Sequence, residues 1–292
     1  MSDLVKRGRG RPVGTGHGIL LRDRDFELLC FVNDMKFASS SALFELFFSR
    51  TYKKGPAKSD LWAKERLEHL RREGFLKKVR TFYEMQSYYL VTEKGVNTLR
   101  GHFLDEEIPN WVSEIDARYY RHDLHILKCR VTLEIEGRAR DWECERRIRS
   151  RILADIVAKY PTYHERGLRE QAKENARYLI PDGIYTNKQG ERIAFEFEES
   201  IKEPERYATK LEGYLKQING SKPDFKRVLF VTSKLNVYSV LEKLTRPYAE
   251  LKVFRVNMLE TVLGAKVVGV ASSHGQAVDS GPSRSSGDVH VG

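Results

Sequence analysis

Apolar residues recur at helical spacing in three segments near the N-terminus, at residues 22–32, 39–48 and 59–74. Side chains three and four positions apart lie on one face of a helix, so each segment is expected to form an amphipathic helix. A serine at positions 39–41 can cap the second helix, and Ser59 can cap the third. Gly74 is suited to end the third helix because glycine readily adopts the left-handed conformation.

Residues 75–91 indicate two strands around a turn, and residues 92–99 close the unit. Three helices followed by a hairpin is the order of a winged helix-turn-helix domain, whose third helix enters the major groove of DNA. A three-helix protein-interaction domain is the alternative, but the basic outer face of the third helix favours DNA. The residues expected to contact DNA from this helix are Lys58, Lys64, Arg71 and Arg72.

The remainder of the chain alternates between helix and strand patterns, and residues 161–179 are polar without a clear period. The predicted helices cover residues 115–137, 146–160, 203–218 and 237–247. The predicted strands cover residues 138–145, 179–186, 192–199, 227–233 and 251–256, of which the second and third form a hairpin. This order predicts a mixed α/β sheet flanked by helices.

The composition is that of a soluble globular protein, with 40% hydrophobic and 32% charged residues in a chain of 292 that is long enough for two domains. No apolar run approaches the ~20 residues of a membrane helix, and the N-terminus does not resemble a signal peptide. The three cysteines, Cys30, Cys129 and Cys144, are far apart and form no CxxC pair. This cysteine usage favours a reducing cytoplasm.

The net charge of +10 is concentrated near the N-terminus, where residues 1–80 contain 18 Lys and Arg against 10 Asp and Glu. Nucleic acid is the commonest partner for such a surface, and a solvated basic face is the alternative. Within this region RGRGRPVG, residues 7–14, resembles an AT-hook. Arg7, Arg9 and Arg11 are expected to contact phosphates and the A·T-rich minor groove, whose negative potential favours arginine. The alternative interpretation is a solubilising basic tail.

Two carboxylates share one face of the strand predicted within IAFEFEE, residues 193–199. Side chains two apart in a strand point the same way, so Glu196 and Glu198 lie together, and hairpin pairing brings Asp182 beside Glu196. Buried like charges repel, so either this face is wet or a cation lies there. Carboxylate oxygens suit Mg²⁺ or Mn²⁺, which would activate a water and stabilise charge on a phosphate. The sequence therefore predicts a metal site at Asp182, Glu196 and Glu198, with an exposed acidic edge as the alternative.

Three further charged residues are candidates for the same site. Lys210 lies at the edge of the apolar face of the helix predicted at residues 203–218 and could turn toward the carboxylates. Glu143 and Glu145 follow Trp142 at the end of an earlier strand, and either could add a ligand.

Two pairs on the helix predicted at residues 115–137 are interpreted as structural. His122 and His125 are three positions apart, but the sequence offers no third ligand near them. Tyr119 and Tyr120 resemble the paired tyrosine nucleophiles of some relaxases, but no His-x-His motif stands beside them. Both tyrosines are therefore interpreted as core or interface aromatics.

The motif PDG followed by FEFEE resembles the core of PD-(D/E)XK nucleases. That resemblance implies a mixed sheet with an acid on one strand and an acid-x-lysine on the next. This chain departs from the pattern because Glu198 occupies the lysine position, as in some restriction enzymes of that fold. Lys210 is the candidate replacement, since migrated lysines occur in that superfamily.

Residues 20–265 as a whole resemble the replication-relaxation family, which includes MobC-type plasmid relaxases. The motifs that carry the resemblance, in chain order, are AKERLEHLRREGFL, YRHDLHI, WECE, PDG with FEFEES, and ATKLEGY. The resemblance implies a winged helix before a nuclease-like domain, and site-specific nicking of plasmid origin DNA in mobilisation or replication.

The sequence supports one hypothesis above two others. The first is a cytoplasmic, metal-dependent nickase acting on double-stranded origin DNA together with mobilisation or replication proteins. The others are a regulator with a degenerate nuclease domain and a partner-binding accessory protein of mobilisation. The predicted layout is an AT-hook-like tail at residues 1–18, a winged helix at 19–110, a PD-(D/E)XK nuclease-like domain at 111–268 and a disordered tail at 269–292.

Overall fold

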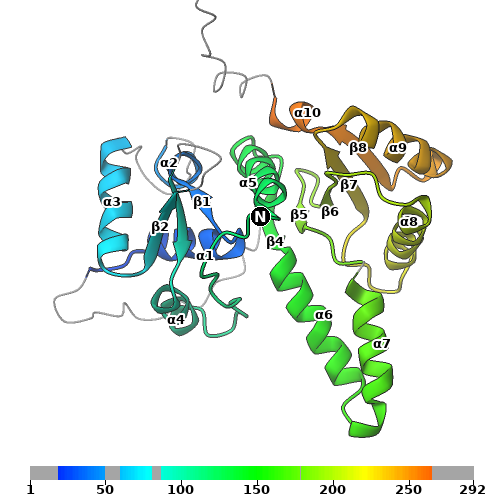
Figure 1. Cartoon of the computed structure of the whole chain (residues 1–292), viewed down its shortest axis with the longest axis horizontal. Coiled ribbons are helices and arrows are strands. Elements are labelled where there is room, and N and C mark those ends of the chain that lie inside the picture. Colours follow the sequence, from blue (N-terminus) through cyan, green and yellow to red (C-terminus); the bar gives the residue numbers. More distant parts are fainter. Residues whose placement is uncertain (1–18, 50–59, 81–86, 178, 265–292) are drawn as a thin grey trace, which may run out of the picture.

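The computed structural model describes residues 19–49, 60–80, 87–177 and 179–264 (Figure 1). Over these residues the protein is a mixed α/β structure with two sheets and ten α-helices. The predicted DNA contacts Arg7, Arg9, Arg11 and Lys58 lie outside the described residues, as do the predicted cap Ser59 and the predicted tail at 269–292. None of the helices in the described segments combines the length and the hydrophobicity needed to span a bilayer.

The first part of the chain contains the three predicted helices and the predicted hairpin. The helices are α1 (Asp23–Asp34), α2 (Ser40–Phe47), α3 (Asp60–Arg72) and α4 (Glu93–His102), and the strands are β1 (Ala38–Ser39), β2 (Leu76–Arg80) and β3 (Ser87–Val91). The strands form an antiparallel sheet in the order β1-β3-β2. The Ser39 side chain accepts a hydrogen bond from the Ala42 amide, 3.1 Å away, and Gly74 adopts a φ of +78° just after α3. Local capping chemistry thus fixes these helix ends as predicted.

The second part of the chain is built on a five-stranded sheet. Its strands are β4 (Arg140–Cys144), β5 (Gly183–Thr186), β6 (Arg192–Phe197), β7 (Arg227–Thr232) and β8 (Phe254–Met258), in that spatial order. Its helices are α5 (Tyr120–Ile135), α6 (Glu145–Lys159), α7 (Arg166–Arg177), α8 (Pro204–Ile218), α9 (Leu235–Thr245) and α10 (Leu259–Leu263). Pairing is antiparallel from β4 to β6 and parallel from β6 to β8. The predicted mixed α/β sheet is confirmed.

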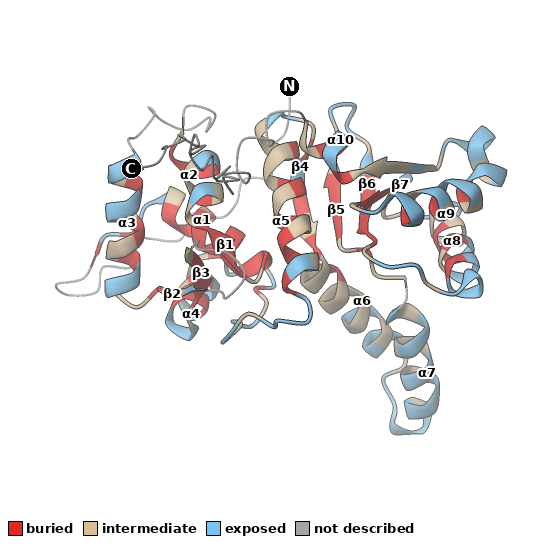
Figure 2. Cartoon of the chain, turned by 45° about the horizontal axis from the view of Figure 1, so that its top comes forward, coloured by how far each residue is buried: buried red, intermediate tan, exposed pale blue. Residues whose placement is uncertain are grey.

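Helix α7 was not predicted, because the sequence from 161 to 179 shows no apolar period. The structure gives the physical reason, since α7 buries none of its residues. Figure 1 shows α6 and α7 lying side by side and projecting away from the sheet, and Figure 2 shows α7 largely exposed. A helix with no buried face leaves little trace in the hydrophobic pattern.

Helix α5 lies between the two sheets and contacts both parts of the chain (Figure 1). Its Tyr120 hydroxyl lies 2.8 Å from the Tyr88 hydroxyl on β3, and the Tyr120 ring stacks on Phe37. One buried apolar cluster runs from α1 through α5 to β6 and α10. This packing sets the position of α5 relative to the end of β6, where the acidic residues lie.

Candidate functional site

The acidic residues lie where β5 begins and β6 ends. Gly183 pairs with Phe195 across the antiparallel ladder, so Asp182 reaches the end of β6. There the Phe197 amide donates a 2.7 Å hydrogen bond to Asp182 Oδ2. Glu196 and Glu198 are 3% and 1% exposed, so the predicted face is dry rather than an exposed acidic edge.

The cation at this face is a lysine of the protein. Lys210 on α8 places Nζ 2.6 Å from Glu196 Oε2 and 3.2 Å from Glu198 Oε1. Lys202 places Nζ 2.8 Å from Glu198 Oε1 and 2.6 Å from Glu198 Oε2. The Tyr214 hydroxyl, one helical turn after Lys210, donates a hydrogen bond to Glu196 Oε1. Pairing of this kind offsets the cost of burying two carboxylates.

Within this acidic cluster, Asp182, Glu196, Glu198 and Lys210, the pKa values of Asp182 and Glu196 are shifted in opposite directions. Burial raises the pKa of Glu196 to about 7, and the Asp182 and Glu198 charges add to the effect although Lys210 opposes it. Burial would lower the pKa of Lys210, but Glu196 and Glu198 raise it. Burial acts to raise the pKa of Asp182, but His122, Lys210 and the Phe197 amide together lower it. Glu196 can therefore change its charge near neutral pH.

His122 joins the cluster, although the sequence pattern indicated a structural histidine. Its Nε2 lies 3.5 Å from Asp182 Oδ2 and its Nδ1 lies 3.6 Å from Asp123 Oδ1. Burial acts to lower the pKa of His122, but Asp123 and Asp182 raise it to about 10. Lys36, from the loop after α1, lies 2.7 Å from Asp123 Oδ1 and extends this line of alternating charges. No local signal could reveal His122, because Asp182 is remote from it in sequence.

The other residues singled out on α5 lie outside the cluster. His125 packs its ring on Phe197, with the ring centroids 4.8 Å apart, and burial lowers its pKa. Tyr119 is 56% exposed, whereas Tyr120 is buried in the core. Tyr120 is therefore a core aromatic, and Tyr119 lies at the surface.

Glu145 and Glu143 bind arginines. The Glu145 amide donates to the Asp182 carbonyl oxygen at 3.2 Å, so its backbone adjoins the cluster, but its carboxylate lies 2.5 Å from Arg149. Glu143 lies 3.1 Å from Arg151 and 2.7 Å from Arg192. The catalytic role predicted for Glu145 stays a prediction.

The carboxylates of this site are suitable ligands for a divalent metal, but the side chains are not arranged to coordinate one. Within the described segments no group of three or more His, Cys, Asp or Glu side chains is placed to hold a metal. Both Glu196 oxygens accept bonds from Lys210 and Tyr214, and Glu198 is held by two lysines. Carboxylate oxygens still suit Mg²⁺ or Mn²⁺, which often take only two carboxylates and keep their waters. Coordination by Asp182 and Glu196 would require Lys210 to withdraw from Glu196.

The basic residues predicted to contact DNA from α3 are exposed and engaged in local pairs. Lys64 pairs with Asp60, and Arg71 lies 2.5 Å from Glu68, while Arg72 is exposed. Exposed pairs of this kind are weak, so both side chains can exchange these partners for phosphates. The sequence pattern missed three more exposed cations, Lys77, Lys78 and Arg80 on β2.

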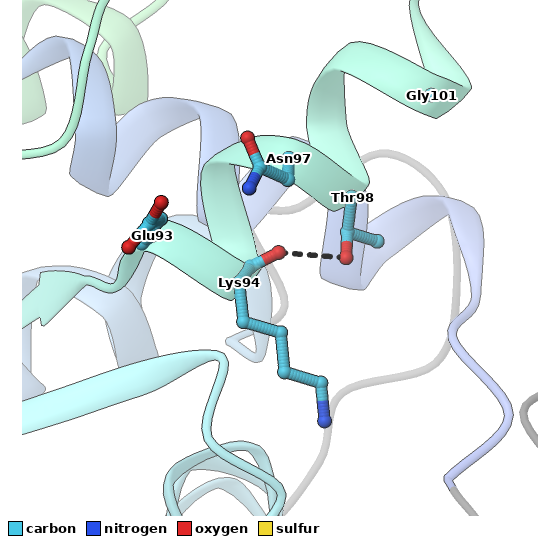
Figure 3. A pocket seen from close by; sticks show the side chains of 5 residues that line it. All are labelled: Glu93, Lys94, Asn97, Thr98 and Gly101. Atoms are coloured by element: carbon cyan, nitrogen blue, oxygen red, sulfur yellow. Dashed lines mark hydrogen bonds between the residues drawn. The ribbon is translucent and has the colours of Figure 1, made fainter.

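A surface pocket lies elsewhere, on α4. It is lined by Glu93, Lys94, Asn97, Thr98 and Gly101 (Figure 3). The Thr98 hydroxyl donates a 2.8 Å hydrogen bond to the Lys94 carbonyl oxygen, and Lys94 Nζ donates to the Glu73 carbonyl oxygen at 2.6 Å. Lys94 and Thr98 therefore form hydrogen bonds within the local fold.

Comparison with known proteins identifies a family. The family model described as replication-relaxation matches residues 29–228, more than half of the chain. The matched range runs from α1 to the start of β7 and contains the acidic cluster and His122. No curated protein and no solved structure gives a significant match.

Proposed function

The chain belongs to the replication-relaxation family, and we propose that it acts on DNA in plasmid replication or mobilisation by metal-dependent nicking at an origin. The observation that carries this proposal is Lys210 seated between Glu196 and Glu198, beside Asp182. Three acids and a lysine at the end of a mixed sheet resemble a PD-(D/E)XK nuclease site. Lys210 on α8 supplies the positive charge that Glu198 lacks.

Three residues of the acidic cluster, Lys210, Glu196 and Asp182, have stated roles in this proposal. Lys210 holds a positive charge where a scissile phosphate would lie and stabilises negative charge that develops there. Glu196, whose pKa is about 7 without a metal, can release its proton near neutral pH and so become available as a metal ligand. Asp182 and Glu196 would hold Mg²⁺ or Mn²⁺, which, when bound, supplies Lewis acidity and lowers the pKa of a bound water.

DNA recognition is assigned to the first part of the chain. Three helices and a hairpin support a winged helix-turn-helix, with α3 as the helix that enters the major groove. Lys64, Arg71 and Arg72 are its proposed contacts, and their surface is distinct from the acidic cluster. The AT-hook-like arginines are proposed to add affinity without base specificity, because they contact phosphate and the minor groove.

A second candidate function is a DNA-binding regulator or accessory protein that does not cut. The specific observation in its favour is that Glu196 and Glu198 already have protein partners at every oxygen. In that case the acidic cluster would be a structural ion-pair network, which stabilises the packing of α8 on the sheet.

Supercoiled plasmid carrying the cognate origin separates the two functions. With Mg²⁺ the protein should convert it to the open circular form, and with chelator it should not. Asp182→Asn should bind the origin and fail to nick. Asp224→Asn is the matched control, because Asp224 lies in the separate network with Arg151 and Arg192. Origin binding without open circular product under any divalent metal would support the regulator instead.

A further inference from the structure

Helix α3 carries a carboxylate within a group of cations. Glu68 lies on α3, Arg71 and Arg72 follow it by about one turn, and Lys78 lies on β2, which contacts α3. The hydrogen bond from Arg71 lowers the pKa of Glu68, and the charges of Lys78 and Arg72 lower it further, so this carboxylate is ionised at neutral pH. Figure 1 shows α3 on the outer side of the first part of the chain, away from the second part.

The geometry of the pair formed by Glu68 and Arg71 leaves one edge of the guanidinium unoccupied. Arg71 Nε lies 2.9 Å from both Glu68 carboxylate oxygens, and Arg71 Nη2 lies 2.5 Å from Glu68 Oε1. These contacts use the edge formed by Nε and Nη2. Within the described segments Arg71 Nη1 has no hydrogen-bond partner, so the edge formed by Nη1 and Nη2 can donate two parallel hydrogen bonds to a ligand. Both side chains are 42% exposed, so a ligand can reach the pair.

A carboxylate is unfavourable on a surface that binds DNA, because it repels phosphates. Glu68 nevertheless lies among the cations of the surface proposed to contact DNA. Holding Arg71 in one orientation would offset this repulsion, since a guanidinium that is fixed before binding loses less conformational freedom on binding. Phosphate contact does not require such alignment, whereas recognition of a base depends on the direction of the donors.

We propose that Arg71 recognises a guanine in the major groove through its Nη1 and Nη2 edge, and that Glu68 is the positioning residue that orients it. Two donors in a fork match guanine O6 and N7. Arg72 is exposed and, among the described residues, forms no ion pair, so it is expected to contact phosphate instead. The proposal rests on the DNA-binding role proposed above for α3, and it adds which residue reads a base and which base it reads.

Selection from a library of duplexes with a randomised central segment tests the proposal, with the full chain and without metal. The wild type should prefer guanine at one position by about 5- to 150-fold over the other bases, which is the discrimination of one bidentate contact. Arg71→Lys keeps the charge but loses the fork, so it should lose this preference. Arg72→Ala should instead weaken binding to all these duplexes equally and reduce the magnitude of the salt slope by about 1.

Glu68→Ala tests the positioning role separately. Removal of the negative charge should raise the affinity for every duplex, but loss of the orientation of Arg71 should reduce the guanine preference at the same position. Glu65→Ala is the matched control, because Glu65 is exposed on the same helix and its loss should leave the preference intact. A guanine preference equal to that of the wild type in Glu68→Ala would overturn the positioning role, because the pair would then be only a surface ion pair.

The outcomes separate base recognition from DNA binding itself. A guanine preference that survives in Arg71→Lys would overturn base recognition by Arg71, and so would a loss of affinity that is equal for all duplexes. Weaker binding by Arg72→Ala would in either case keep the DNA function. A wild type that binds all duplexes alike would also overturn base recognition, and a wild type that binds no duplex even at low salt would contradict both this proposal and the function on which it rests.

Discussion

Replacing Glu196 by Gln should change how stability depends on pH, because this buried carboxyl holds its proton more tightly in the folded chain. Its pKa rises from 4.5 to about 7, first through burial and then through the Asp182 and Glu198 charges. Lys210 is shared between two carboxylates and cannot fully compensate either. The folded state therefore binds more protons than the unfolded state between pH 4.5 and 7.

The sign and size of the effect follow from this difference in proton binding. A carboxyl with a raised folded pKa destabilises the fold as pH rises, and the loss is complete above the folded pKa. At 1.36 kcal/mol for each pH unit, the ionisation of Glu196 costs the wild type about 3 kcal/mol between pH 4.5 and 8. Glu196→Gln cannot ionise, so the unfolding free energy of the wild type minus that of the variant should fall by about this amount.

Urea denaturation of both proteins in chelator, followed by tryptophan fluorescence at intervals from pH 4.5 to 8, measures this difference. Other titrating groups are common to both proteins, so their contributions largely cancel. A difference that is constant over the range would refute the argument that Glu196 titrates near neutrality. A difference that rises with pH would show that Lys210 dominates and that the carboxylate is ionised throughout.

Three further predictions concern other parts of the molecule. The pKa of His122 is raised to about 10, so protonated His122 stabilises the fold below pH 6.5 and this effect is lost as pH rises through 10. The unfolding free energy of wild type minus that of His122→Gln should therefore decrease by roughly 3–5 kcal/mol from pH 6.5 to 10.5. A difference that does not change with pH would contradict this prediction. On α4, Gly95→Ala should lower the unfolding free energy by about 1–3 kcal/mol, because the new Cβ would lie 2.6 Å from the Phe75 carbonyl oxygen. Gly101→Ala places a Cβ with nothing within 4 Å and should be neutral or stabilising by up to about 1 kcal/mol. Urea denaturation in which both variants behave alike would be inconsistent with this packing. Amide hydrogen exchange should be much faster in α7, which buries no residue, than in α8, which buries Tyr207, Leu211 and Tyr214, and equal protection would argue against this difference in burial.

The elements that the sequence predicted are those with a buried face or a strong local signal. RVLFVT forms β7 as a continuous apolar run, and the hairpin of β5 and β6 turns at Gly190, whose φ is +80°. These signals act over a few residues, so a single sequence contains them. Helix α7 has neither a buried face nor such a signal, which is why its polar segment could not be assigned.

The sequence predicted only some residues of the candidate site, and the reason differs from that for α7. Strand alternation places Glu196 and Glu198 on one face, and the hairpin brings Asp182 to them. The contributions of His122 and Tyr214 depend on how α5 and α8 are rotated against the sheet. That rotation is set by packing between segments far apart in the chain. The domain boundary predicted near residue 110 stays a prediction, as does the metal.

The central claim is that Lys210 supplies the positive charge of a nicking site, and single-turnover nicking by Lys210→Met tests it most directly. Lys216→Met is the matched control, since Lys216 is exposed on the same helix. On supercoiled origin plasmid with Mg²⁺ and saturating protein, Lys210→Met should nick about 10²–10³-fold more slowly than wild type. Lys216→Met should nick at the wild-type rate. Equal rates for Lys210→Met and wild type would contradict the assignment of this cluster as the nicking site.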